Sequence, residues 1–230
     1  MSTRLADNVA LVRQRISSAA SRCGRTPEDI RLLAVSKTVG AEAVREAFGA
    51  GITDFAENRM QEAAEKMAAL HDLPIKWHFI GHLQTNKAKA AVKAGFELIH
   101  SIDSDRLLFE LDRQAEKTGR PQRALIEVNV GGEESKHGVA KEAFMKLLEE
   151  SKKIKSIKIE GLMAIPPFFE DPEYARPFFR RLRALRDEAQ RAGYSLPELS
   201  MGMSHDFEMA IEEGATIIRL GTILFGERKK

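Results

Sequence analysis

Lys37 is the residue of this sequence best placed for covalent chemistry. It follows the apolar run 31–35 (RLLAV) and Ser36, so a strand over that run would leave the lysine amine at the strand's end, among apolar neighbours. Desolvation at such a place lowers the pKa of a lysine, and the neutral amine can attack an aldehyde. Two plainer interpretations stay open: the lysine extends into solvent, or it pairs with Glu57.

A second group of residues, near the C-terminus, is suited to binding an anion. Ser204 begins a helical pattern (SHDFE), where its hydroxyl could cap the helix while free backbone N–H groups face a phosphate. Gly221, followed by Thr222, lets the backbone approach a ligand closely. Ser204 is equally compatible with a plain helix cap, and Gly221 with a simple turn.

Arg219 is the charged residue of the otherwise apolar run 216–220 (TIIRL). A guanidinium buried there needs a partner, so we expect either an internal carboxylate or a ligand beside it. His82 follows another apolar run, and it could approach a ligand at the same rim or hydrogen-bond a carbonyl. His78 and His82 span the end of a predicted strand and do not share a helix face, so we expect no metal site.

A repeated pattern of apolar runs, polar turns and helical segments must position these residues. Several of the runs are rich in β-branched and aromatic residues, as strands buried on both faces require. The predicted strands cover residues 31–35, 52–55, 75–80, 96–99, 124–130, 157–163, 198–201 and 216–220. Small and polar residues follow the runs, which is typical of a ligand site built by the loops after parallel strands.

Helical spacing of apolar residues fills the intervals between the strands. The predicted helices cover residues 41–50, 58–70, 85–94, 105–117, 141–152, 173–192 and 205–213. This alternation predicts one (β/α)8 TIM-type barrel, an α/β fold, as a single domain over residues 1–230. Segment 4–22 is expected to complete the outer ring of helices, because few residues follow the last strand. An open doubly wound sheet is the alternative.

Composition narrows the class of protein. Lys and Arg number 36 against 34 Asp and Glu, a net charge of +2, so we expect neither a nucleic-acid nor a membrane partner. The single cysteine, Cys23, excludes an intramolecular disulfide. No early stretch resembles a signal peptide, and no run approaches the roughly 18 apolar residues of a membrane span, so we expect a cytoplasmic protein.

The motifs, taken in order, resemble those of the pyridoxal phosphate homeostasis proteins, also called the proline synthetase co-transcribed or alanine-racemase-like family. The resemblance covers nearly the whole chain. The matching stretches are AVSKT (34–38), EN (57–58) with QE (61–62), WHFIGHLQ (77–84) with NK (86–87), GLMAIP (161–166), LSMGMS (199–204), DFE (206–208), GAT (214–216), Arg219, GT (221–222) and FG (225–226). Two positions depart from the family pattern: Ala56, where glycine is usual, and His205, where an acidic or small residue is frequent.

The resemblance implies a fold-type III barrel that binds pyridoxal 5′-phosphate (PLP) as a Schiff base on Lys37. Ser204, Gly221 and Thr222 would hold the phosphate, and Arg219 would lie near the pyridine nitrogen. The positions that match the cofactor site of the family, with His82 as a less certain member, are Lys37, Asn58, Met203, Ser204, Arg219, Gly221, Thr222 and His82.

The resemblance also implies a role without turnover: holding PLP, buffering its free concentration and delivering it to apo-enzymes, which supports amino-acid balance. We expect a monomer that contacts apo-enzymes transiently. An amino-acid racemase is the first alternative. Arg219 does not decide against it, since racemases of this fold have such an arginine, but the barrel uses up the chain and we expect no further domain to supply a second base. A Schiff-base aldolase without cofactor, colourless as purified, is another alternative.

Overall fold

The centre of the molecule is a closed ring of parallel strands. The structure is a computed structural model that describes residues 4–133 and 137–226. The strands of the ring are β1 (Arg31–Val35), β2 (Asp54–Glu57), β3 (Lys76–Phe79), β4 (Leu98–Ile102), β5 (Gln122–Asn129), β7 (Ile157–Met163), β8 (Glu198–Ser200) and β9 (Ile217–Leu220). The sheet runs from β4 through β1 and β9 to β5, and a further pairing of β4 with β5 closes it into a barrel. The two-residue strand β6 (Val139–Ala140) pairs with the end of β5 outside the ring.

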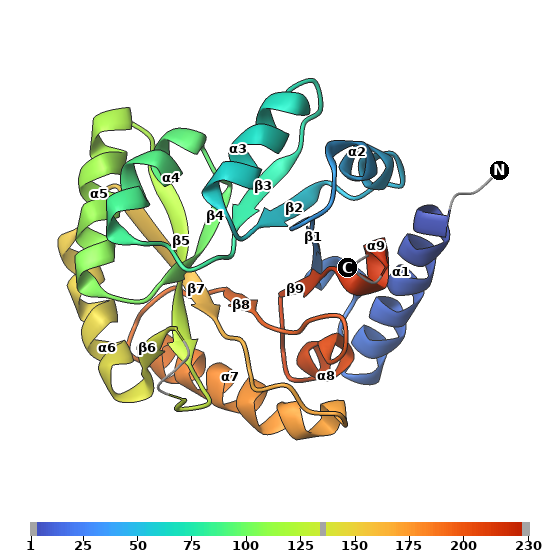
Figure 1. Cartoon of the computed structure of the whole chain (residues 1–230). Coiled ribbons are helices and arrows are strands. Elements are labelled where there is room, and N and C mark those ends of the chain that lie inside the picture. The colour runs from blue at the N-terminus through green and yellow to red at the C-terminus, as the bar shows by residue number, and fades with distance from the viewer. Residues whose placement is uncertain (1–3, 134–136, 227–230) are drawn as a thin grey trace.

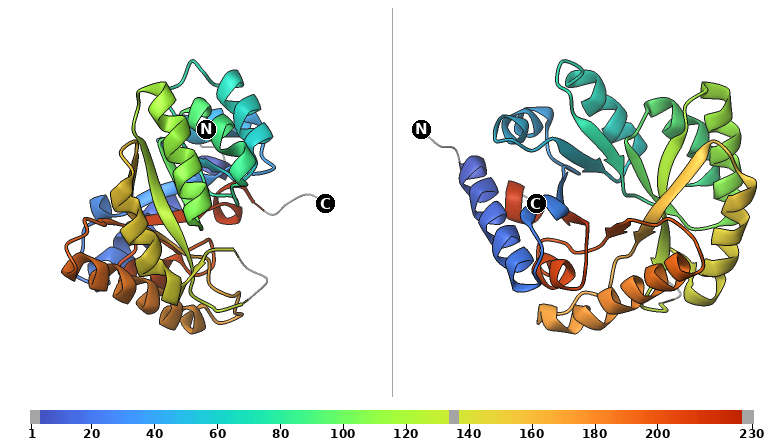
Figure 2. Two further views of the ribbon diagram at one scale, coloured as in Figure 1. Left: turned by 90° about the vertical axis from the view of Figure 1, so that its left-hand side faces the viewer. Right: turned by 180° about the vertical axis from the view of Figure 1, so that it is seen from behind.

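Helices surround this barrel on its outer side, as Figures 1 and 2 show. They are α2 (Ala41–Gly49), α3 (Met60–Ala69), α4 (Ala88–Ala94), α5 (Asp105–Thr118), α6 (Lys141–Glu150), α7 (Arg176–Arg191), α8 (Phe207–Glu212) and the short α9 (Thr222–Phe225). Each helix turns one apolar stripe towards the strands, and this stripe buries the outward-facing side chains of the sheet. The α/β barrel predicted from the sequence is confirmed, and the open-sheet alternative is wrong.

The strands alternate their side chains between two apolar regions, as the period of a β-strand requires. One large cluster fills the space between the barrel and the helices. A smaller cluster lies inside the barrel, and its buried members are Leu33, Val35, Ala56, Leu98, Leu125, Met163 and Ile217. Buried polar side chains, including those of His78, His100 and Ser200, also come from the strands.

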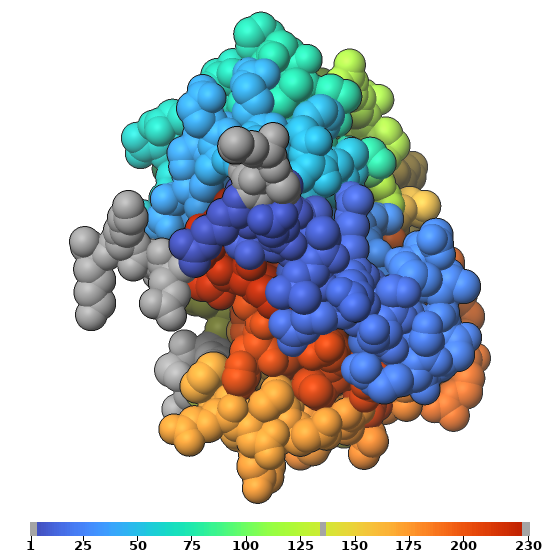
Figure 3. Space-filling model, turned by 90° about the vertical axis from the view of Figure 1, so that its right-hand side faces the viewer, coloured from blue at the N-terminus to red at the C-terminus, as the bar shows by residue number. Residues whose placement is uncertain are grey.

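Helix α1 (Arg4–Arg22) occupies the place in the outer ring next to the C-terminal elements. Its apolar residues, including Val9 and Val12, are buried, and it packs against α8 and α9. Arg15 forms an ion pair of 2.7 Å with Glu208, and Asn8 Nδ2 donates to Leu224 O at 2.9 Å. Figure 3 shows α1 lying across the C-terminal segment on this face. The prediction that the N-terminal helix completes the ring is confirmed.

The predicted bounds differ most from the structure where tertiary hydrogen bonds intervene. The strand expected from residue 52 begins at Asp54, because Ile52 N donates to Ala47 O and stays attached to the end of α2. The helix expected from residue 205 begins at Phe207. Neither β6 nor α9 was expected, since both are too short to show a periodicity. Among the described helices, none combines the length and the apolar character needed to cross a membrane.

Candidate functional site

Lys37 lies at the rim of the barrel, where the loops after the strands meet. It follows β1 by two residues and is half-buried. Ser36 N donates to Ala56 O at 3.0 Å, which extends the pairing of β1 with β2 up to the lysine. Thr38, the next residue, has a φ of 66°, and its N–H donates to Glu62 Oε2 at 3.2 Å. A threonine in the left-handed region costs free energy, so the surrounding contacts hold this turn in place.

A buried ion pair lies beneath the Lys37 turn. Lys66 Nζ is 2.5 Å from Glu57 Oε1 and donates to Ser36 O at 2.6 Å. Ser36 Oγ donates to the same Glu57 oxygen at 2.7 Å. Glu57 is fully buried and Lys66 is 8% exposed. The structure thus pairs Glu57 with Lys66, a residue that the sequence did not single out because α3 brings it to the pair from outside the barrel.

The Ser204 hydroxyl lies at the start of α9. Its Oγ accepts hydrogen bonds from the N–H groups of Gly221 (3.2 Å) and Ile223 (3.4 Å). The expectation that Ser204 caps the helix of its own segment is therefore wrong. Asp206 stands at the N-cap position of α8 instead, and its Oδ1 accepts from Met203 N at 2.6 Å, which closes the intervening turn.

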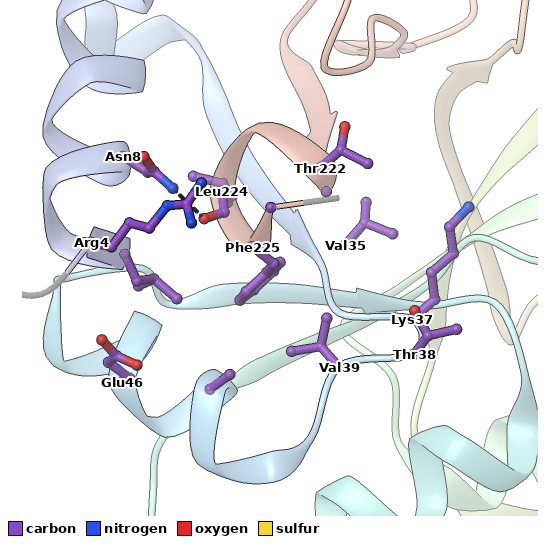
Figure 4. Close-up of a pocket in the computed structure, with 14 residues that line it drawn as sticks. Arg4, Asn8, Val35, Lys37, Thr38, Val39, Glu46, Thr222, Leu224 and Phe225 are labelled. Carbon is purple, nitrogen blue, oxygen red and sulfur yellow. Dashed lines mark hydrogen bonds between the residues drawn. The ribbon is translucent and has the colours of Figure 1, made fainter. Parts of the chain in front are cut away.

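Gly221 and Thr222 form the beginning of α9, next to β1. Together with Val35 and Lys37 they line one end of a cavity of about 620 Å³ that continues between α1 and α2 to Arg4, Asn8 and Glu46. Figure 4 shows the Lys37 amine extending away from Arg4, Asn8 and Glu46. This cavity therefore lies on the outer side of the loop, and the candidate site is the rim on the side to which the amine extends.

Arg219 extends from β9 into buried surroundings. Its Nη1 donates to Ser200 O (2.7 Å) and to Ser200 Oγ (2.8 Å), and its Nη2 donates to Ala164 O (2.9 Å). Its hydrogen-bond partners are thus uncharged, and among the described residues no carboxylate, the first of the two expected alternatives, accepts a hydrogen bond from it. Burial lowers the pKa of Arg219 to about 10, while Asp206 and Glu127 oppose this effect, so the guanidinium remains charged at neutral pH.

Asn58 and Met203 follow the carboxyl ends of strands, at the same end of the barrel as Lys37. Asn58 directly follows β2, the neighbour of β1, and is half-buried. Its position is tight, because a Cβ on Gly81 would lie 2.0 Å from Asn58 O. Met203 directly precedes Ser204 and is also half-buried. Because β2, β1, β9 and β8 are consecutive in the ring, the structure gathers Asn58, Lys37, Arg219, Gly221 and Ser204 at adjacent strand ends.

His82 is directed to another group of residues. Its Nδ1 is 3.3 Å from Asp103 Oδ2, and its ring stacks on that of His137 with 3.8 Å between centroids and 9° between planes. One ligand atom from each of the three residues lies within 4.8 Å of the others. A metal ion lies near the plane of an imidazole that binds it, so two parallel stacked rings cannot both bind one ion without rotating.

Several buried polar residues of the barrel were not assigned to the candidate site from the sequence. Burial first, and then the neighbouring Asp103, raise the pKa of Glu127 to about 7. His78 and His100, both fully buried, hydrogen-bond to each other inside the barrel. The only signal in the sequence was the placement of these residues on or beside predicted strands, and the inward direction of each side chain depends on strand register.

Comparison with known proteins places the chain among relatives of the same length. The family model described as the alanine racemase N-terminal domain matches residues 3–229. The pyridoxal phosphate homeostasis protein of Aquifex aeolicus is 51% identical over 224 residues, covering 97% of this chain and 98% of the relative. That of Escherichia coli is 40% identical over 229 residues, covering 97% of both chains.

Solved structures of known proteins also superpose on this chain. PipY of Synechococcus elongatus, solved with PLP bound, superposes with a TM-score of 0.87 at 38% identity, covering 97% of this chain and 100% of PipY. Alanine racemase of Clostridium difficile superposes with a TM-score of 0.76 at 16% identity, covering 97% of this chain and 60% of the racemase. The latter likeness concerns the fold alone.

Proposed function

Because the chain belongs to the alanine racemase N-terminal domain family, and within it to the pyridoxal phosphate homeostasis proteins, we propose that it binds PLP as a Schiff base on Lys37. The observation that carries the proposal is the gathering of an amine, an arginine and the hydroxyl of Ser204 with the N–H of Gly221 that it accepts, at adjacent ends of β1, β9 and α9. PLP, when bound, supplies an aldehyde that the lysine amine can trap and a conjugated ring that absorbs visible light.

The residues present fit this cofactor in two respects. Three of the five N–H groups of Arg219 have acceptors, and the other two find none among the described residues, although the side chain is only 4% exposed. A pyridine nitrogen would be the acceptor for one of them. The second respect is the start of α9, where Ser204, Gly221 and Thr222 lie together. Ser204 Oγ accepts from the N–H groups of Gly221 and Ile223, and a bound phosphate would take its place as their acceptor.

The remaining proposed contacts come from residues around Arg219 and the start of α9. Asn58 and Met203 border the rim on either side of Lys37, where they would limit the position of the ring. His82 is the least directly placed, since its contacts are with Asp103 and His137. We assign it to the edge of the site, where it would meet the cofactor only at the solvent side.

The role we propose is to hold PLP and regulate its availability, without turnover. The support for this role is that relatives of 40–51% identity, matched over nearly their whole length, are named homeostasis proteins. We further propose that the protein acts in the cytoplasm as a monomer of one PLP-binding domain, and that it delivers PLP to apo-enzymes through transient contacts.

A spectroscopic titration tests the proposal. Purified protein freed of ligand is mixed with PLP, and the visible absorption band of the bound cofactor is recorded for the wild type and for Lys37→Ala. We expect the band in the wild type, its loss in Lys37→Ala, and no change in Lys93→Ala, which removes an exposed lysine of α4. A wild type that gives no band, or a Lys37→Ala protein that retains it, contradicts the proposed site.

The absence of turnover has a separate test. The loaded protein is incubated with L-alanine, and D-alanine is measured over time by chiral chromatography. We expect no D-alanine beyond what free PLP produces alone. Steady formation of D-alanine that depends on Lys37 would replace the homeostasis role with that of a racemase.

A further inference from the structure

Five polar side chains form a continuous hydrogen-bonded chain through the barrel interior. Asp54 Oδ1 lies 3.1 Å from His78 Nε2, and His78 Nδ1 lies 3.1 Å from His100 Nε2. His100 Nδ1 lies 2.9 Å from Ser200 Oγ, which accepts from Arg219 Nη1 at 2.8 Å. The residues come from β2, β3, β4, β8 and β9, and none is more than 7% exposed.

The aspartate end determines the direction of every hydrogen bond in this series when both imidazoles are neutral. An ionised aspartate can only accept, so His78 donates from Nε2 to Asp54, and His78 Nδ1 accepts from His100 Nε2. His100 Nδ1 then accepts from the Ser200 hydroxyl, whose oxygen accepts from Arg219 because an arginine can only donate. Both histidines carry their hydrogen on Nε2.

The electrostatic surroundings favour neutral imidazoles in this arrangement. Burial, and then the neighbouring His78 and Arg219, hold the pKa of His100 well below its ordinary value. Burial lowers the pKa of His78 as well, although Asp54 opposes this effect. Burial alone would raise the pKa of Asp54, but hydrogen bonds from His78 and Thr53 bring it below its ordinary value. The reverse direction would set His78 Nε2 against Asp54 as two acceptors unless His78 were charged.

The hydrogen-bonded series from Asp54 to Ser200 has a consequence for Arg219, the residue at its end. Both N–H groups of Nη1 are directed to Ser200 and one N–H of Nη2 to Ala164 O. Because a guanidinium is planar and rigid, fixing these three bonds fixes the directions of its Nε–H and its second Nη2–H. Those are the two N–H groups that lack an acceptor among the residues the structure describes.

We propose that Asp54, His78, His100 and Ser200 are positioning residues that hold the Arg219 guanidinium in one orientation, so that one of its two remaining N–H groups donates to the ring nitrogen of PLP. The inference rests on the proposed function. It adds that affinity for PLP and the electronic state of the bound ring depend on residues of the barrel interior that do not touch the cofactor. His100 lies at the middle of the hydrogen-bonded series. Replacing it therefore measures best how PLP binding depends on these interior residues.

The test compares two replacements of His100. Leucine removes both polar atoms, whereas glutamine keeps one acceptor and one donor and can restore the chain. His71→Gln, at an exposed position after α3, is the matched control. For each protein, PLP affinity is measured by absorbance titration, the visible absorption maximum is recorded, and unfolding of the ligand-free protein in urea gives the purely structural cost.

We expect His100→Leu to weaken PLP binding about tenfold, the equivalent of about 1.4 kcal/mol, and to shift the absorption maximum. His100→Gln should restore both to near the wild type, and His71→Gln should leave both unchanged. A folded His100→Leu protein with wild-type affinity and spectrum overturns the inference. So does a glutamine variant that loses as much as leucine, because the loss would then follow packing and not hydrogen bonding.

A second measurement needs no variant and no cofactor. Nitrogen-15 NMR of the ligand-free wild type distinguishes the two neutral tautomers of a histidine and its charged form. We expect His78 and His100 both neutral with hydrogen on Nε2, and a hydrogen on Nδ1 of either contradicts the chain. If the wild type fails to bind PLP, the proposed function is contradicted. The NMR result does not depend on PLP, so it tests the direction of the hydrogen bonds separately.

Discussion

Replacing Lys66 with methionine removes the only charged partner that the described residues give to the buried carboxylate of Glu57. Glu57 has no exposed surface, its Oε1 receives Lys66 at 2.5 Å and Ser36 at 2.7 Å, and its Oε2 has no hydrogen-bond partner among the described residues. Removing one member of a buried ion pair leaves the other charge desolvated, which costs about 3–5 kcal/mol. We expect a loss of that size in the free energy of unfolding.

The assay is equilibrium unfolding in urea of the ligand-free protein at neutral pH, followed by circular dichroism. Lys89→Met on α4 is the control, since this exposed lysine should change the stability by no more than about 0.5 kcal/mol. The double variant Lys66→Met with Glu57→Gln removes the stranded charge, and it should recover at least half of the loss.

A loss below about 1 kcal/mol in Lys66→Met would refute the reasoning, because that is the size expected for a solvent-exposed pair. If the double variant is no more stable than Lys66→Met, the loss of stability comes from altered packing and not from the unpaired charge of Glu57. The same variants also test whether the ion pair affects the candidate site, since Lys66 Nζ donates to Ser36 O, one residue before Lys37. Lys66→Met should therefore also weaken PLP binding.

Three further predictions concern the rim and its surroundings. Burial raises the pKa of Glu127 to about 7 in the folded state from an ordinary value of 4.5, so its contribution makes the wild type lose about 3 kcal/mol of stability as pH rises between these values. Glu127→Gln should abolish that decline, which urea unfolding at several pH values measures. Gly81→Ala places a Cβ 2.0 Å from Asn58 O and should cost about 1–3 kcal/mol and weaken PLP binding, as thermal unfolding and titration would show. Gly49→Ala meets no atom within 4 Å and should stabilise α2 by up to about 1 kcal/mol, so equal losses in both would contradict the steric argument.

The barrel was predictable because its signals are local. The bounds of β1 and β7 agree with the apolar runs 31–35 and 157–163, since each strand begins and ends with its run. Lys37, Ser204 and Gly221 could be assigned to one rim because the carboxyl ends of parallel strands meet at the same end of a barrel. Where a local signal was ambiguous, as for Ser204, the hydrogen bonds to Gly221 and Ile223 decided its role.

The interior polar chain could not be predicted in the same way. His100 and Ser200 are separated by 100 positions, and His78 and His100 by 22. Their meeting depends on the register of the strands and on which face of each strand is turned inward. A shift of one residue reverses that face, and the observed bounds of β4 lie two to three residues beyond the predicted run 96–99.

The central claim is that the amine of Lys37 binds the aldehyde of PLP. Reduction of the loaded protein with borohydride, followed by mass mapping of its peptides, tests this claim most directly. We expect one pyridoxyl group, attached to Lys37 in the peptide that joins β1 to α2. A pyridoxyl group on a different lysine, or none on the chain when PLP is bound in stoichiometric amount, would contradict it.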